Sequence, residues 1–244
     1  MRRSLVFAAC ITAACLTAGS ASAAPAGSSG AFTFRLGGFF PSGDSDFWRA
    51  NEAAFTLDHS DFDGIIGGVG YTGAVNNYFE VGGNIDFYNE VVRSADRNFS
   101  DSIGNPIFHD TRLYEVPLTL DLKFLPTGRY ARRGTGGNHY VRHPVPYIGG
   151  GIGAVYWQYE EQGDFVATDL SIVYSRFVDS GVEFEQHAFA GLEFPVSPNW
   201  GITLEGRYAW CDTAVGGSFS TLSPPPGRLE LGGFSFFVGG ALRF

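Results

Sequence analysis

Charged residues are scarce in this chain. They make up 17% of its 244 residues, against about 25% in ordinary soluble domains. Long apolar runs are missing too: after the first two dozen residues, no stretch approaches the ~18 uncharged apolar residues that a membrane-spanning helix needs. This excludes a helical membrane protein. Basic residues are also few, 16 against 25 acidic ones, which argues against nucleic acid binding.

Cysteine is limited to three residues, two of which lie in the first segment of the chain. That segment has two arginines, then an apolar run, then the small residues Ala21–Ala23, which is the order found in a secretory signal peptide. We predict that residues 1–23 are a signal peptide and that residues 24–244 form one domain. Cleavage leaves only Cys211, so no internal disulfide is expected. Lipidation at Cys15 is an alternative that Thr12 disfavours, because such sites usually carry an aliphatic residue there.

Glycine and aromatic residues are abundant instead. The chain has 34 glycines, about twice the usual ~7% share, and 23 phenylalanines. A soluble domain would have to hide nearly all of this phenylalanine in one core. The length is within the range of single all-β barrels. We therefore favour a strand-rich domain in which much of the phenylalanine lies outside a single apolar core.

Alternation of apolar and polar residues recurs in segments of about 9 to 11 residues, the length of a membrane-spanning strand. From Tyr114 to Phe124, every even position is apolar, and the odd positions between them are mostly polar or ionisable. Seven other segments complete a set of eight predicted strands. The eight ranges are Phe32–Phe40, Phe62–Tyr71, Phe79–Phe87, Tyr114–Phe124, Tyr147–Trp157, Val182–Phe194, Trp200–Trp210 and Leu229–Phe244.

The predicted connections alternate in length. Bacterial outer-membrane barrels have short periplasmic turns and long external loops. We therefore expect short turns at Thr72–Asn77 and Pro195–Asn199. Four long outward loops are expected at Pro41–Asp61, Asn89–Leu113, Glu160–Gly181 and Cys211–Arg228.

One link, Pro126–Pro144, departs from this scheme because it is long and basic although its position calls for a periplasmic turn. Its basic residues are Arg129, Arg132, Arg133, His139, Arg142 and His143. We expect a solvated, flexible turn. A phosphate-rich partner is the alternative, but no clear aromatic stacking pattern accompanies these charges.

Alternation alone also permits a β-sandwich. Strand length, the loop pattern and the export signal favour a membrane barrel, in which the apolar face meets lipid and the polar face meets the lumen. The chain ends with aromatic and aliphatic residues on one face of the last strand: Phe234, Phe236, Val238, Leu242 and Phe244, with Gly240. This pattern resembles the terminal signature that the assembly machinery of outer-membrane barrels recognises.

The resemblance covers nearly all of the chain after residue 23 and points to the small eight-stranded outer-membrane barrels, OmpA-like and OmpW-like proteins included. It implies an all-β, eight-stranded antiparallel up-and-down transmembrane barrel in the bacterial outer membrane. OmpA proteins continue into a peptidoglycan-binding domain, whereas this sequence stops at its last predicted strand, so no such tethering role is expected.

The interior of an eight-stranded barrel is about wide enough for side chains to fill. Inward charges must therefore be paired or hydrated, because burying an unpaired charge is costly. We predict a polar network in the lumen, with an ion or solute path along the same groups as the alternative. Its members are Arg35, Glu80, Asp86, Glu115, Asp121, Lys123, Glu183, Glu185, His187, Glu193, Glu205, Arg207 and Arg243.

No catalytic or metal site is predicted. His187 could act as a general base, but no motif supplies a nucleophile beside it. The acidic cluster of Asp58, His59, Asp61 and Asp63 lacks the glutamate that completes a calcium-binding EF-hand loop. Other loop acids are expected to face solvent, where divalent cations could bridge them to lipopolysaccharide phosphates. These are Asp44, Asp46, Asp96, Asp101, Asp164 and Asp169.

The sequence thus predicts a non-enzymatic outer-membrane barrel without cofactors, with an envelope-structural or surface-interaction role through its external loops. The alternatives are a narrow channel for small or apolar solutes and a lipid A-modifying enzyme. The expected partners are outer-membrane lipid, lipopolysaccharide and the barrel assembly machinery, but no nucleic acid. The oligomeric state is not predicted.

Overall fold

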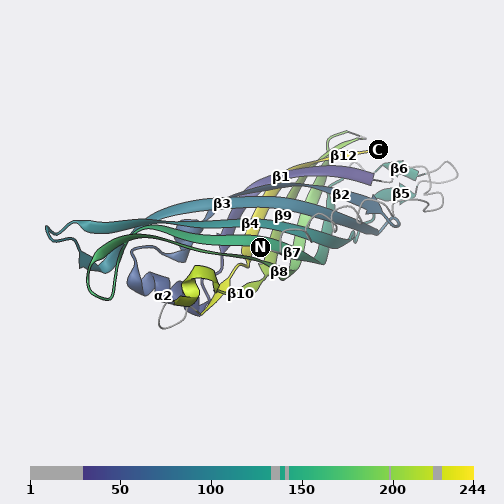
Figure 1. Ribbon diagram of the computed structural model, residues 1–244. Helices are drawn as coiled ribbons and strands as arrows, with labels where there is room; N and C mark the ends of the chain where they lie inside the picture. The colour runs from purple at the N-terminus through teal and green to yellow at the C-terminus, as the bar shows by residue number, and fades with distance from the viewer. Residues whose placement is uncertain (1–29, 133–137, 141–142, 198, 222–226) are drawn as a thin grey trace.

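A computed structural model describes residues 30–132, 138–140, 143–197, 199–221 and 227–244. Eight antiparallel strands close into a barrel in the order β1-β12-β9-β8-β7-β4-β3-β2 (Figure 1). Their bounds are β1 Gly30–Pro41, β2 Gly64–Ala74, β3 Phe79–Ser100, β4 Pro106–Phe124, β7 Val145–Val166, β8 Ile172–Pro195, β9 Trp200–Trp210 and β12 Gly233–Arg243. The predicted eight-stranded up-and-down barrel is confirmed. Among the described residues, no helix combines the length and apolar character needed to cross a membrane.

Four neighbouring strands are far longer than the rest. β3, β4, β7 and β8 contain 22, 19, 22 and 24 residues, whereas β2, β9 and β12 contain 11 each. Figure 1 shows these four strands running well beyond the others on the left. We call this end of the barrel the extended end. The opposite end, where the β2–β3 and β8–β9 turns lie, is the turn end.

Two of the four predicted long loops are therefore wrong. Most of Asn89–Leu113 and Glu160–Gly181 belongs to paired strands, joined only by residues 101–105 and 167–171. Ladder pairing satisfies most of the backbone of these segments, with one register shift between Ala95 and Ser100. β-branched and aromatic residues such as Val91, Phe108 and Val173 favour the strand conformation. The loop prediction failed because it ended each strand at the width of a membrane.

The other two long connections fold into compact elements at the extended end. The first contains helix α2 (Asp46–Ala54) and the 3₁₀ helix η1 (His59–Phe62). The last contains β10 (Asp212–Ala214), η3 (Gly217–Thr221) and β11 (Arg228–Glu230). We call these five elements the cap. Two predicted strand boundaries were wrong here, because Phe62 belongs to η1 and Leu229 to β11.

The cap packs on the inner face of the long strands around an apolar core. α2 begins at Ser45, whose side chain accepts a hydrogen bond from the Trp48 backbone N–H. The helix then buries Phe47 and Trp48, and the Phe47 ring lies edge-on against Tyr159 with 4.9 Å between centroids. Other core members are Phe39, Leu57, Phe62, Tyr88, Leu113, Val155, Trp157, Phe219, Leu229 and Phe237.

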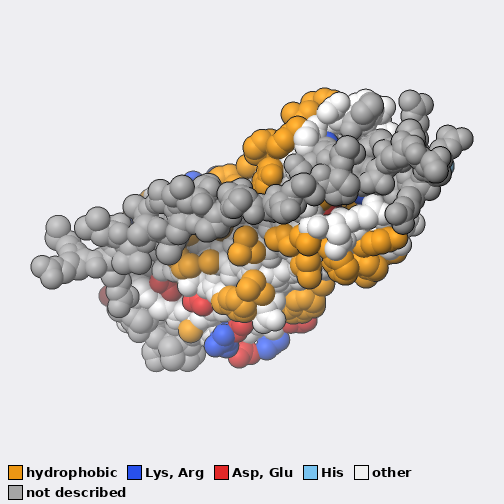
Figure 2. All heavy atoms as spheres, turned by 90° about the vertical axis from the view of Figure 1, so that its right-hand side faces the viewer, with side chains coloured by type: hydrophobic (Ala, Val, Ile, Leu, Met, Phe, Trp, Pro, Cys, Tyr) orange, Lys and Arg blue, Asp and Glu red, His pale blue; other side chains and the backbone are white. Residues whose placement is uncertain are grey.

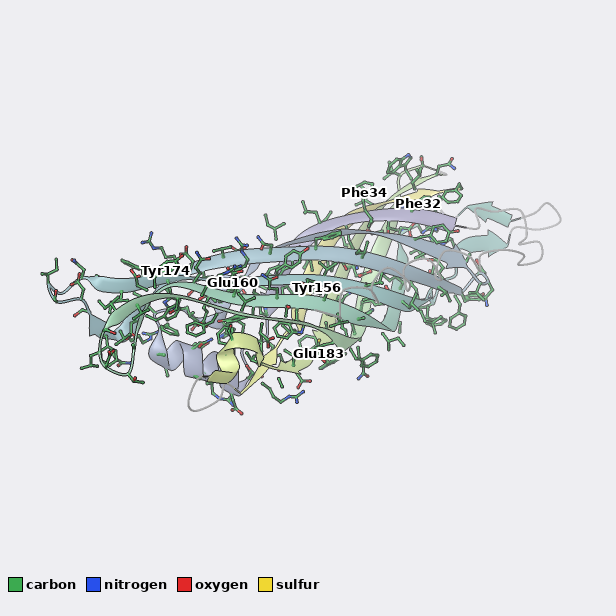
Figure 3. The ribbon with its side chains drawn as sticks, viewed as in Figure 1. Phe32, Phe34, Tyr156, Glu160, Tyr174 and Glu183 are labelled. Atoms are coloured by element: carbon green, nitrogen blue, oxygen red, sulfur yellow. The ribbon has the colours of Figure 1, made fainter. Side chains whose placement is uncertain are left out.

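The outer face of the barrel wall is apolar. Figure 2 shows hydrophobic side chains gathered in patches on the wall, and Figure 3 shows Phe32 and Phe34 on β1. Exposed members of this face include Phe32, Phe34, Leu36, Val81, Leu118, Leu120, Leu122, Ile152, Phe184, Ile202 and Val238. Aromatic residues lie at both margins, with Tyr71, Trp200 and Phe244 toward the turn end and Phe40, Tyr208 and Trp210 toward the extended end. Such girdles mark the two interfaces of a membrane barrel.

One carboxyl group is buried where the cap meets the wall. Glu161 on β7 accepts a hydrogen bond from the Tyr159 hydroxyl at 2.9 Å, and the Asn51 amide of α2 donates to that hydroxyl at 3.0 Å. Burial raises the pKa of Glu161 to about 7. Its folded form holds a proton that the unfolded form releases at lower pH, so the folded state loses stability as pH rises between the two pKa values.

We therefore expect Glu161 to contribute about 2 kcal/mol more to the stability of the docked cap at pH 5 than at pH 8. The buried His109 ring, which contacts Phe55 at the end of α2 and has a lowered pKa, acts in the opposite direction. Amide hydrogen exchange of α2 measures this difference. Glu161→Gln should remove this contribution, so that the cap of the variant gains stability from pH 5 to pH 8 relative to the wild type, whereas the exposed control Asp164→Asn should follow the wild type. Equal pH dependence in the wild type and Glu161→Gln would contradict the assignment.

Candidate functional site

Two layers of paired charges fill the lumen. The layer nearest the turn end joins Arg129 and Arg243 to Glu80 and Glu193. Arg129 Nε lies 2.5 Å from Glu80 Oε1, and Arg129 Nη1 lies 3.1 Å from Glu193 Oε2. Arg243 Nε donates to Glu193 Oε1 at 2.8 Å. All four side chains are at most 4% exposed, so each charge depends on the others for compensation.

Arg129 is the main site residue that the sequence analysis missed. It lies in the basic link between β4 and β7, which was interpreted as a solvated turn. For Arg129 that interpretation is wrong, because its side chain is 2% exposed and reaches into the lumen. The neighbouring Lys123 Nζ lies 4.2 Å from the centre of the Tyr147 ring, a cation–π contact. Arg133 and Arg142 lie outside the described residues, as do the side chains of Arg132 and His139.

The middle layer is built on two arginines from strands β1 and β9. Arg35 binds Asp86 through two nitrogens, with Nε 2.8 Å from Oδ1, and its Nη1 lies 3.2 Å from Glu205 Oε1. Arg207 Nη2 lies 3.1 Å from the same Glu205 oxygen and 3.0 Å from Asp121 Oδ2. This layer crosses the lumen, because its members come from β1, β3, β4 and β9.

His187 lies between Asp121 of the middle layer and the carboxylate of Glu185. Its Nε2 lies 2.9 Å from Asp121 Oδ1, and its Nδ1 lies 2.9 Å from Glu185 Oε1. Asn84 also donates to Asp121, at 2.7 Å. A histidine held between two carboxylates in this way is positioned as a structural bridge, and no Ser or Cys side chain is among its contacts in the described part of the chain.

Two predicted members lie apart from these pairs. Glu115 is 4% exposed, and its Oε1 has no hydrogen-bond partner among the described residues. Glu183 is half-buried near the extended end and accepts a hydrogen bond from Thr213 of β10 at 2.9 Å. The structure thus places eleven of the predicted residues in the lumen network, which consists of the ion pairs, the His187 bridge and the contact between Lys123 and Tyr147. It adds Arg129 to this network. The eleven are Arg35, Glu80, Asp86, Asp121, Lys123, Glu185, His187, Glu193, Glu205, Arg207 and Arg243.

A contact between a histidine and a hydroxyl side chain occurs in the wall of the extended end. Ser94 Oγ lies 3.0 Å from His109 Nε2, but each residue is 2% exposed. The rings of Phe55 and Phe165 lie 4.2 Å and 4.9 Å from the imidazole centre. Burial lowers the pKa of His109 to about 4. The arrangement packs a neutral histidine in an apolar setting and leaves no room for a substrate.

The acidic cluster at the start of β2 has a local structural role. Asp58 caps η1 and accepts from the Ser60 backbone N–H at 2.9 Å, while Asp61 accepts from the Asp58 backbone N–H at 2.8 Å. The group that could hold a metal ion is different: Glu52, Asp58 and His59. Glu52 Oε1 and Asp58 Oδ1 lie 2.9 Å and 3.2 Å from His59 Nδ1.

The last strand presents the predicted terminal residues on the outer face. Phe234, Phe236, Val238, Leu242 and Phe244 are all between 38% and 54% exposed. The alternate residues Ser235 and Phe237 face inward and are buried. β12 pairs with β1 along its whole length and closes the barrel.

The comparison with solved structures is the one that finds proteins similar to this chain. No protein-family model and no curated protein matches the chain. Among solved structures, the outer membrane protein OprG from Pseudomonas aeruginosa is 16% identical with a TM-score of 0.51, covering 89% of this chain and 97% of its own. A major outer membrane protein from Thermus thermophilus is 11% identical with a TM-score of 0.46 and coverages of 88% and 99%. The outer membrane protease OmpT from Escherichia coli is 9% identical with a TM-score of 0.41 and coverages of 89% and 94%.

Likeness at this level of identity speaks for the fold and not for an activity. OprG and this chain cover each other almost completely, so the shared architecture extends over the barrel as a whole. The chain has the fold of the small bacterial outer-membrane β-barrels, which confirms the resemblance expected from the sequence.

Proposed function

We propose that this protein is a non-enzymatic outer-membrane barrel with a closed lumen, which holds the folded cap at the cell surface for an envelope-structural or surface-interaction role. The observation that carries the proposal is the succession of two charge layers and an apolar core along the barrel interior. The extended end is external in this proposal, since the long connections of outer-membrane barrels face outward. Residues 1–23 are its signal peptide, and the outward residues of β12 are its signal for the assembly machinery.

The filled interior supports a structural role in two ways. Guanidinium groups bridge carboxylates on strands that lie across the lumen, such as Arg35 of β1 between Asp86 of β3 and Glu205 of β9. Beyond them, Tyr88, Trp157 and Phe237 pack together with the cap. An interior built from paired charges and packed rings stiffens the barrel.

The described residues also favour a non-enzymatic role. The Ser94–His109 contact is buried, and His187 is held by two carboxylates. A hydrolytic site needs a nucleophile and a base beside a space for the substrate. Neither histidine has that combination in the part of the chain that the structure describes.

A narrow channel is the second candidate. It is favoured by buried polar atoms in the lumen that have no hydrogen-bond partner among the described residues, namely Glu115 Oε1, Thr119 Oγ1 and Arg207 Nε. Buried polar atoms of this kind usually bind ordered water. A connected file of such water would form a path past the charge layers.

Conductance separates the two candidates. The refolded wild type should show no reproducible single-channel steps in a planar bilayer, because charge layers and packed rings occupy the lumen. Glu205→Gln and Arg207→Gln should be equally silent. Reproducible steps in the wild type that change in either variant would overturn the proposal in favour of the channel.

Removal of Arg129 tests the layer near the turn end. Arg129→Gln leaves Glu80 and Glu193 to share Arg243, so we expect the free energy of unfolding to fall by about 3 kcal/mol, as for a broken buried ion pair. Urea titration of the refolded protein measures this. Arg228→Gln is the control, because Arg228 pairs with Asp212 at the exposed surface and should cost well under about 1 kcal/mol. Equal losses in the two variants would show that Arg129 contributes no more than a surface pair.

A further inference from the structure

Polar and charged side chains line up across neighbouring strands on the outer face of the extended end. Beyond the ends of β2 and β9, the strands β3, β4, β7 and β8 continue as a four-stranded sheet. Residues that pair across this sheet form rows, and alternate rows share a face. From the membrane outward, three successive rows on the outer face are Asn89-Tyr114-Gln158-Ser180, Val91-Arg112-Glu160-Val178 and Arg93-Asp110-Gln162-Arg176.

The rows follow directly on the lipid-facing wall. Tyr156 lies one row nearer the membrane than Gln158, and its ring is 6.2 Å from that of Tyr114, with an edge-on orientation. Figure 3 shows Tyr156, Glu160 and Tyr174 in this order toward the extended end. Tyrosine prefers the interface of a membrane. The arginine rows therefore begin where the lipid headgroups lie.

One arginine is fixed in place by a covered carboxylate. Glu160 Oε1 accepts from Arg176 Nε at 2.6 Å, and Gln158 donates to the other oxygen at 3.2 Å. The Glu160 side chain is 9% exposed, whereas that of Arg176 is 57% exposed. The hydrogen bond from Arg176 holds the pKa of Glu160 below its ordinary value. Arg176 and Gln158 thus cover the negative charge of Glu160, and the guanidinium group of Arg176 faces outward.

Two more arginines share this face without an ion pair. Arg112 lies opposite Glu160 in the β4–β7 register, and Arg93 stacks over the Phe108 ring at 4.5 Å. Both are exposed. Within the described ranges, the contact between Arg176 and Glu160 is the one ion pair that any of the three arginines makes. On the cap, by contrast, the exposed residues Arg49 and Arg228 are paired with Asp46 and Asp212.

We propose that Arg93, Arg112 and Arg176 bind phosphate groups of outer-leaflet lipid on this face of the barrel. Guanidinium groups match phosphate oxygens with paired N–H donors, which suits a fixed anion at a membrane surface. The row of Arg112 and the row of Arg93 and Arg176 lie two and four residues beyond that of Asn89, about 7 and 13 Å along the strands. Because membrane strands tilt by about 45°, these distances correspond to about 5 and 9 Å along the membrane normal. A headgroup layer of roughly 5 to 8 Å on each side of the hydrocarbon core takes in the row of Arg112, and the row of Arg93 and Arg176 lies at its outer edge, within reach of a long arginine side chain. The phosphate is carried by a lipid, since the site adjoins the lipid-facing wall.

The inference depends on the membrane placement and not on whether the lumen conducts. Its test is the binding of lipid A, which carries phosphate groups, to the refolded full chain in detergent, measured by native mass spectrometry. Arg93→Gln with Arg112→Gln should raise the dissociation constant about tenfold, the loss of roughly one charge-assisted contact with phosphate. The double variant Arg49→Gln with Arg228→Gln removes the same charge and should stay within about twofold of the wild type.

Three further measurements identify the ligand and confirm folding. Dephosphorylated lipid A should bind the wild type about as weakly as lipid A binds the Arg93 and Arg112 double variant. The lysine variants Arg93→Lys with Arg112→Lys should retain most of the affinity. A mobility shift between unheated and boiled samples shows that each variant forms the barrel. Equal affinity in both glutamine double variants, equal binding of dephosphorylated lipid, or displacement of lipid A by inorganic phosphate would overturn the proposal.

Discussion

The pairing of guanidinium and carboxylate groups inside the barrel is the interaction on which the rest of the structure depends. An eight-stranded barrel has a narrow interior, so its inward side chains touch one another across the lumen. Charges at these positions cannot reach bulk water, and each must be compensated by a neighbour. Arg35 meets this need by joining strands β1, β3 and β9, and Arg129 meets it from a connection outside the ring of strands. The polar lumen and the apolar outer wall are two results of the same alternation.

The interior changes character along the barrel axis. Charge layers occupy the part surrounded by the lipid-facing wall, whereas the part within the extended end is filled by rings and aliphatic groups. The long strands make this possible, because they supply an inner face on which α2 and η3 can pack. The cap resembles the core of a small soluble domain that has been built onto one side of a membrane barrel.

Much of this architecture could be predicted from the sequence, because alternation and register are local properties. The apolar even positions of Tyr114–Phe124 lie on the outer face, with Leu118, Leu120 and Leu122 more than half exposed. The inward positions of Glu80, Asp121 and Glu205 follow from the same periodicity.

What could not be predicted depends on contacts between distant segments. Arg129 is one of six basic residues in its link, and only its distance to Glu80 and Glu193 sets it apart. The cap was missed although Ser45 and Asp46 form a recognisable helix start, since the strand-based interpretation treated the whole segment as a loop. The extension of β3 and β8 was missed because membrane thickness limits a spanning strand but does not end it.

Arg243 links the charge layer near the turn end to the closure of the barrel. It lies on the last strand, and the carboxylates that it meets lie on β3 and β8. Until β12 docks beside β1, Glu80 and Glu193 have one guanidinium between them. Closure of the cylinder and completion of the charge pairing in this layer are therefore a single event. A chain that stalls before its final strand keeps an excess of negative charge in its unfinished lumen, and that electrostatic imbalance favours completion over arrest.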